Sequence, residues 1–249
     1  MAMTRTVSSS RVPIRNIPYS IWGHPDNARR INCGSSDTIL DGKGFTVAFY
    51  ASVSLASRLW THGFNFGTNK GYLMRCAGMA SGSTIQVFCG SSTVSFTGAV
   101  KKLDYGAWHH YAVSFDGVST WKLYVDFVLV DTKTGAFPRN ADTGGVMAFM
   151  SEGVGTLNKS TGMTELLVID RVMTADEITA LKNANYPSDV LGFFPCDEGS
   201  GTDVHNESGS LATATLVGGA NIAWRTSSPS KIRTAASNRV AITIPRTSV

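Results

Sequence analysis

Hydrophobic residues alternate with polar or small residues through most of the chain, and this alternation predicts β-strands. One segment places apolar side chains at every second position: Phe45, Val47, Phe49, Ala51 and Val53. The segment 109–115 alternates in the same way and ends at Asp116-Gly117, a dipeptide typical of turns. Similar short runs lie near 58–64, 71–76, 84–89, 92–97, 121–129, 145–150 and 163–170. This spacing favours an antiparallel sandwich or jelly roll over βαβ units.

One segment departs from this pattern and predicts a helix. Thr174 precedes Glu177 by three residues, which is the spacing of a capping box. Ile178 and Leu181 then form an apolar stripe within 175–184, and Pro187 stops the helix. We therefore expect one short helix at about 174–184, covering one end of an all-β sandwich.

Length and composition limit the class of protein. The chain has 249 residues, of which 43% are hydrophobic and 16% charged, so it can build a core and is not a disordered polyelectrolyte. No apolar run approaches 18 residues, which predicts no membrane span. The first 20 residues contain no apolar core of a secretory signal, which predicts synthesis in a reducing compartment.

Charge divides the chain into three parts. Residues 1–30 carry five arginines and one aspartate, residues 31–207 carry 12 bases and 17 acids, and 208–249 carry five bases and no acid. We interpret 1–30 as an extended basic arm, 31–225 as the jelly-roll domain, and 226–249 as a linker with a C-terminal strand. Such arms either are solvated tails or bind nucleic acid, a membrane or an acidic protein face. Their expected assembly contacts are Arg5, Arg11, Arg15, Arg29, Arg30, Arg239, Ile242 and Ile244.

Four cysteines, Cys33, Cys76, Cys89 and Cys196, occur without a CxxC motif or a zinc-ligand spacing. If GMASGST is a hairpin turn centred between Gly82 and Ser83, Cys76 and Cys89 face each other within disulfide range. A reducing compartment favours the alternative, two buried free thiols.

Three segments together resemble the laminin-G-like family of concanavalin-A-like jelly rolls. They are WHHYAVSFDG with WKLYVD at 108–126, TELLVIDRVMTADEI at 164–178, and LGFFPCDEGSGT at 191–202. The resemblance implies a two-sheet antiparallel jelly-roll sandwich. The third segment usually opens the domain, so its place after the helix implies a circular permutation or an end strand that completes the sheet. Phe127 follows Asp126 where the family often has Gly, which disfavours a tight turn there.

Catalytic and metal-binding chemistry is weakly represented. Some members of the family bind calcium, and the candidate ligands here are Asp197 and Asp203, with Asp37 and Asp41, but their spacing matches no calcium loop. Retaining glycosidases need two carboxylates about 5 Å apart. Glu165 and Asp170 are five residues apart and would face opposite sides of a strand. We therefore expect a protein that is not an enzyme, with no cofactor unless calcium binds.

A sugar-binding surface is predicted where aromatic and amide side chains cluster. Its candidate residues are Trp60, Phe64, Asn65, Phe66, Asn69 and Tyr72. In the alternative interpretation, Trp60 and Phe64 are core residues of a strand.

These features favour a non-enzymatic structural protein on a virion surface, such as a phage capsid decoration or a fibre-associated subunit. Its expected partners are capsid subunits within an oligomeric assembly, with neither a membrane nor nucleic acid. The first alternative is a carbohydrate-binding module or adhesin, and the second is a glycan-degrading enzyme.

Overall fold

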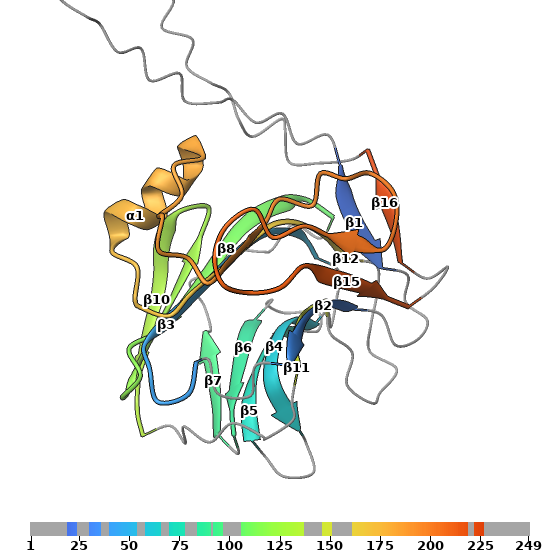
Figure 1. The fold of residues 1–249 in the computed structure, drawn as a ribbon. Coiled ribbons are helices and arrows are strands. Elements are labelled where there is room, and N and C mark those ends of the chain that lie inside the picture. Colours follow the sequence, from blue (N-terminus) through green and yellow to red (C-terminus); the bar gives the residue numbers. More distant parts are fainter. Residues whose placement is uncertain are drawn as a thin grey trace, which may run out of the picture.

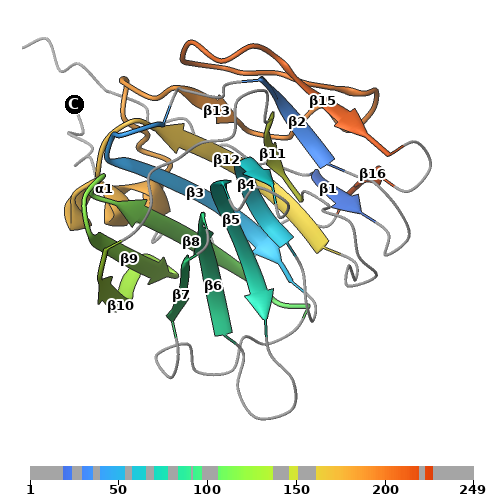
Figure 2. The ribbon, with the colours of Figure 1, turned by 90° about the horizontal axis from the view of Figure 1, so that it is seen from below.

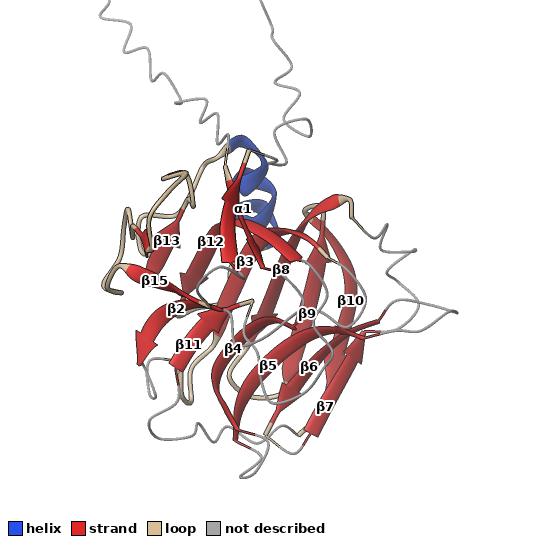
Figure 3. Ribbon diagram, turned by 90° about the vertical axis from the view of Figure 1, so that its right-hand side faces the viewer, coloured by secondary structure: helices blue, strands red, loops and turns tan. Residues whose placement is uncertain are grey.

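The computed structural model describes residues 19–23, 30–35, 40–53, 58–65, 70–77, 84–90, 92–96, 106–136, 146–150, 161–218 and 222–226. These residues form two antiparallel sheets stacked face to face, as Figures 1 and 3 show. The predicted fold class, an all-β two-sheet sandwich with one short helix, is therefore confirmed.

Within the described ranges, each sheet has eight strands. Sheet A has the order β10 (Val128–Thr134), β9 (Thr120–Val125), β8 (Trp108–Phe115), β3 (Phe45–Ser52), β12 (Thr161–Ile169), β1 (Ser20–Gly23) and β16 (Ile222–Arg225), with β13 (Gly192–Phe194) also paired to β12. Sheet B has the order β14 (Asp203–Val204), β15 (Ala214–Val217), β2 (Arg30–Ser35), β11 (Val146–Phe149), β4 (Arg58–Asn65), β5 (Lys70–Ala77), β6 (Thr84–Cys89) and β7 (Ser92–Phe96).

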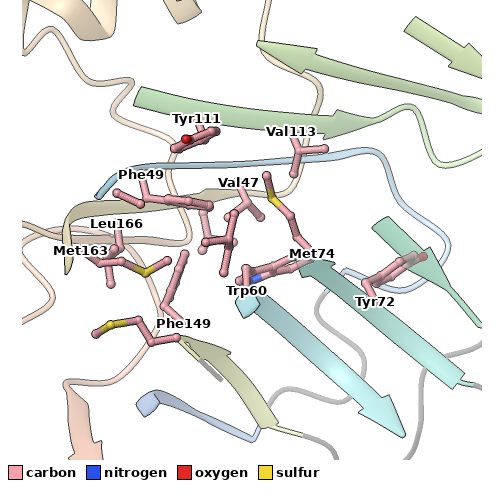
Figure 4. Packing of buried hydrophobic residues seen from close by; sticks show 14 of the residues in the cluster. Val47, Phe49, Trp60, Tyr72, Met74, Tyr111, Val113, Phe149, Met163 and Leu166 are labelled. Carbon is pink, nitrogen blue, oxygen red and sulfur yellow. The ribbon is translucent and has the colours of Figure 1, made fainter. Parts of the chain in front are cut away.

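The main core lies between the two sheets. Alternation along β3 directs Val47 and Phe49 inward, where they meet Trp60 and Met74 from sheet B (Figure 4). These four side chains are fully buried. Burial of apolar area, at about 25 cal/mol per Å², therefore holds the two layers together.

A smaller apolar cluster lies on the other side of sheet A, where the helix packs (Figure 1). Helix α1 (Ala175–Ala180) continues into the 3₁₀ turn η1 (Leu181–Asn183). Its capping box is present: the Thr174 hydroxyl accepts the Glu177 backbone N–H, and the Glu177 carboxylate accepts the Thr174 backbone N–H. Ile178 and Leu181 pack on Leu167 and Ile169 of β12, so the helix covers part of the outer face of sheet A.

The sandwich begins earlier than the sequence indicated. Ser20–Gly23 pairs with both β12 and β16, and Ile21 is fully buried, so the segment expected as an extended arm contains a strand of sheet A. Arg30 opens β2 and pairs with Val217 of β15. Burial of the Ile21 side chain in the core stabilises this strand. The short apolar run within an arginine-rich segment does not reveal that burial.

Segments after the helix extend both sheets, and two of their strands lie beside N-terminal strands. β13 pairs with β12, β15 pairs with β2, and β16 pairs with β1. The LGFFPCDEGSGT segment thus supplies an end strand, the second of the two arrangements expected for it. Of the predicted assembly contacts, Arg5, Arg11, Arg15, Arg29, Arg239, Ile242 and Ile244 lie outside the described residues.

A tight turn does form at Asp126-Phe127, contrary to the expectation from the missing glycine. Val125 and Val128 are register partners, so these two residues alone link β9 to β10, and both have positive φ (49° and 68°). The Phe127 ring stacks on His110 with centroids 4.2 Å apart, and the Asp126 carboxylate accepts the His110 backbone N–H. These contacts offset the strain of a left-handed phenylalanine.

All four cysteines are buried free thiols, as the second interpretation predicted. Cys76 pairs with Ile85, and Cys89 pairs with Tyr72, so the register of the β5–β6 hairpin separates the two sulfurs. The hairpin is centred two residues earlier than the sequence suggested. Burial raises the pKa of Cys76 to about 11 and that of Cys89 to about 12, which keeps both thiols protonated and unreactive.

Candidate binding surface on sheet B

A polar row crosses three neighbouring strands on the outer face of sheet B. Tyr72, Met74 and Cys76 of β5 point into the core, so the alternate residue Arg75 points outward. Cross-strand register places Gln86 of β6 opposite Arg75, and Ser95 of β7 opposite Gln86. Figure 2, seen from the sheet B side, shows these strands next to one another.

Hydrogen bonds join the three side chains. The Nε and Nη2 atoms of Arg75 both donate to Gln86 Oε1, at 2.9 and 2.8 Å. Gln86 Nε2 in turn donates to Ser95 Oγ at 3.2 Å. Because each amide and guanidinium group is planar and held by its neighbour, the row is ordered before any ligand arrives.

Aromatic rings border the polar row. The Arg75 guanidinium lies over the Phe88 ring, 4.5 Å from its centroid. Phe64 of β4 packs edge-on against Phe88, with centroids 5.9 Å apart. The side chains of the row and of the two phenylalanines are all partly exposed. Partial burial lowers the pKa of Arg75 from its ordinary value, but the guanidinium stays charged. The surface thus combines fixed hydrogen-bonding groups with apolar rings, which suits a polyhydroxyl ligand.

The residues predicted to bind sugar do not lie on one surface. Trp60 and Tyr72 are 0% and 1% exposed, and their rings lie nearly parallel, 6.4 Å apart, within the core (Figure 4). They therefore cannot form a stacking platform, and for Trp60 the core interpretation was the correct one. Phe64 is part of the outer surface, Asn65 ends β4, and Phe66 and Asn69 lie outside the described residues.

Four residues of this surface were not found by sequence reasoning: Arg75, Gln86 and Ser95 of the row and the neighbouring Phe88. The sequence does predict that Gln86 and Phe88 point outward, since they alternate with the apolar residues Ile85, Val87 and Cys89. The sequence does not predict that Arg75 and Gln86 are cross-strand partners, because the hairpin centre assumed from the GMASGST segment places Arg75 opposite Gly90.

The acidic residues considered for catalysis are held apart. Glu165 is 5% exposed and has a φ of 52° at a β-bulge in β12, where its carboxylate accepts the Tyr186 hydroxyl. Asp170 lies at the surface and pairs with Lys43 at 3.3 Å. One carboxylate is inside the fold and the other outside it, so the two do not face a common groove.

Asp197 and Asp203, the weak calcium candidates, are both exposed. In the part of the chain that the structure describes, no three acidic, histidine or cysteine side chains gather as metal ligands do. Over the same ranges, no helix has the length and apolarity needed to cross a bilayer.

The adjacent histidines of β8, His109 and His110, take opposite faces of sheet A because successive side chains of a strand alternate. His109 Nδ1 lies 2.8 Å from Asp126 Oδ2. His110 is 3% exposed between Tyr50 and Phe127, and burial lowers its pKa to about 3 against the opposing effect of Asp126. His110 is therefore a neutral packing residue and not a ligand.

Comparison with known proteins identifies the family. Residues 27–179 match the Laminin_G_3 model of the concanavalin A-like lectin/glucanases superfamily, and this chain belongs to that family. A search of curated proteins finds no match.

Solved structures share the fold at low sequence identity. A heptameric SAP-like pentraxin from Limulus polyphemus is 13% identical, with a TM-score of 0.53 over 81% of this chain and 97% of the pentraxin. The enzymatically active domain of tailspike protein 2 from bacteriophage CBA120 is 15% identical, with a TM-score of 0.52 over 78% of this chain. The matched region is 36% of that tailspike chain.

Proposed function

We propose that this protein is a non-enzymatic carbohydrate-binding module, with the outer face of sheet B as its binding surface. The observation that carries the proposal is the Arg75–Gln86–Ser95 row beside Phe88. Fixed donors can bond to sugar hydroxyls, while the aromatic edge packs against the apolar face of a pyranose ring. Membership of a lectin/glucanase superfamily is compatible with this activity.

A binding role without hydrolysis is supported by the placement of the acids. Glu165 is engaged by Tyr186 inside the fold, and Asp170 by Lys43 at the surface. Double displacement requires two carboxylates on opposite sides of one glycosidic bond. We therefore expect purified protein to bind polysaccharides and to release no reducing sugar from them.

A glycan microarray followed by calorimetry on the best ligand tests the proposal. Phe88→Ala and Gln86→Ala should each weaken binding about tenfold, the scale of one lost hydrogen bond or ring contact. Val128→Ala is the control, because Val128 is a 64% exposed apolar residue on the other sheet, in the edge strand β10 of sheet A. Equal affinity of all three variants would exclude this face as the binding surface.

A second proposal concerns where the module works: on the surface of a virion, as a decoration or fibre-associated subunit. β1 and β16 are paired with Ser20 opposite Arg225, so the chain enters and leaves the sandwich at one edge of sheet A. The preceding residues 1–18 contain three arginines and no acid, and residues 227–249 contain four bases and no acid. Bases attached at one point can pair together with carboxylates on a capsid subunit. The phage origin of one structural relative agrees with this setting.

Deletion of residues 1–18 tests the virion proposal. The deletion ends before Tyr19 because β1 belongs to sheet A and its loss would uncover Ile21. We expect the truncated protein to keep its thermal stability and to lose attachment to particles. Full occupancy on particles after this deletion would refute an anchoring role for the N-terminal segment.

A further inference from the structure

The geometry of the row points to a more specific ligand: we propose that it binds a saccharide that carries a carboxylate, and that Arg75 selects for that charge. This inference rests on the proposed glycan-binding function and adds the chemical class of the ligand. It follows from three properties of the row: the hydrogen-bond donors left over, the fixed orientation of the guanidinium, and the neighbour on β4.

Donors outnumber acceptors along the row. Arg75 uses Nε and one N–H of Nη2 on Gln86, and within the described structure its Nη1 donates to no group. Gln86 Nε2 has a second N–H beyond the one given to Ser95, and Gln86 Oε1 already accepts twice. The Ser95 hydroxyl accepts from Gln86 and retains its own proton. The row therefore offers several donors and little acceptor capacity, which favours an oxygen-rich anion.

The guanidinium is fixed in the orientation that a carboxylate needs. Gln86 holds the side formed by Nε and Nη2, and the Phe88 ring lies against the face of the group. This leaves the edge formed by Nη1 and Nη2, where two parallel N–H groups can bond to both oxygens of one carboxylate. A neutral sugar hydroxyl would use one of these two donors.

Among the residues that the structure describes, competition for the Arg75 guanidinium is weak. The residue opposite Arg75 on β4 is Arg58, which is 9% exposed, so that register position supplies a base and no carboxylate. The groups that Arg75 contacts, Gln86 and Phe88, are both neutral. The guanidinium charge is therefore not neutralised by the groups it touches, and a ligand carboxylate would form the charge-assisted bond at this site.

Binding to paired polymers tests the proposal. The probes are polygalacturonate, alginate, hyaluronate and polysialic acid, each compared with its carboxyl-reduced form, which keeps the chain and loses the charge. The uncharged form of the bound polymer should bind about ten- to a hundredfold more weakly, as the loss of a charge-assisted pair predicts. Arg75→Gln should remove this preference, and so should Gln86→Glu, because a carboxylate at position 86 would neutralise the Arg75 charge and repel the carboxylate of the ligand. Lys182→Gln, which removes one exposed charge on η1, should change nothing.

The outcomes separate this inference from the function on which it rests. A preference for the acidic form that survives Arg75→Gln, or equal affinity for both forms, would overturn the role of Arg75 and leave glycan binding in place. Absence of binding to these polymers together with an empty glycan array would overturn both proposals. Circular dichroism and thermal melting of each variant establish that a loss of affinity is not a loss of fold.

Discussion

The two outer faces of the sandwich differ in what covers them. On sheet A, the outward residues Ala48, Ala112, Leu167 and Ile169 are apolar and are buried under helix α1. On sheet B, the corresponding surface of β5, β6 and β7 carries Arg75, Gln86 and Ser95, which bond to one another and remain partly exposed.

The difference shows that alternation gives each strand an inward and an outward face but does not determine whether the outward face is covered by another element or accessible to a ligand. An apolar outward face needs a cover, since exposing it to water would cost about 25 cal/mol per Å². A polar outward face needs none and stays accessible to a ligand. Substitutions on sheet A should therefore change stability, whereas substitutions in the row should change binding.

The largest effect is expected from Gly71, where β4 and β5 approach each other in sheet B. Its φ is +78°, and an added Cβ would lie 2.2 Å from the carbonyl oxygen of Gly63. Gly71→Ala should lower the free energy of unfolding by about 3 kcal/mol or more, measured by urea denaturation. Gly42→Ala is the matched control, because Gly42 has a similar φ of +67° and open space around it. It should cost about 1 kcal/mol, and equal losses would contradict the steric argument.

Removal of the cover on sheet A should have the next largest effect. Ile178 is fully buried between α1 and the sheet, so Ile178→Ala should cost about 3 kcal/mol in urea unfolding. The affinity of the folded variant for glycans should stay unchanged, because the row lies on the opposite sheet. Val128→Ala, at an exposed site, should change stability by less than about 0.5 kcal/mol. A loss of affinity in Ile178→Ala would contradict the separation of the two faces.

Burial of His110 should make the free energy of unfolding depend on pH. Its folded pKa of about 3 lies below the ordinary value of 6.5 because of burial, so the unfolded chain binds a proton that the folded chain excludes. The stability associated with the neutral ring is therefore present above pH 6.5 and is lost as the pH falls toward 3. The slope is at most about 1.4 kcal/mol per pH unit. His110→Phe should flatten the profile of stability against pH in this window.

The helix cap should contribute least. Thr174 supplies the hydroxyl half of the capping box, and Thr174→Ala should cost about 1 kcal/mol. Thr179→Ala removes a hydroxyl of the same helix that bonds to the Ala175 carbonyl, and it should cost less because no N-terminal donor loses its partner. The difference between the melting temperatures of the two variants measures the contribution of the capping hydrogen bond to stability. Equal melting temperatures would show that packing alone holds α1 in place.

Much of the fold could be read from local pattern. Alternation over 45–53 and 109–115 predicted β3 and β8, and the pair Thr174 and Glu177 predicted the capped helix. The turn at Asp126-Phe127 was missed because its strain is offset by stacking on His110, a residue 17 positions away from Phe127 in sequence. The early start of the sandwich was missed because the strand partners of Ile21, Met163 and Trp224, lie 142 and 203 positions later in the sequence.

The candidate surface was only partly predictable. Phe64 was singled out and lies on it, while Trp60 and Tyr72 were singled out and belong to the core, because aromatic residues serve both purposes equally well. By itself, the sequence determined the inward and outward sides of each strand, since successive side chains point to opposite faces of a sheet. Only the tertiary structure decided which outward residues meet. A hairpin shifted by two residues keeps every side chain on its face but changes its partner, and that register aligned Arg75 with Gln86 and Ser95.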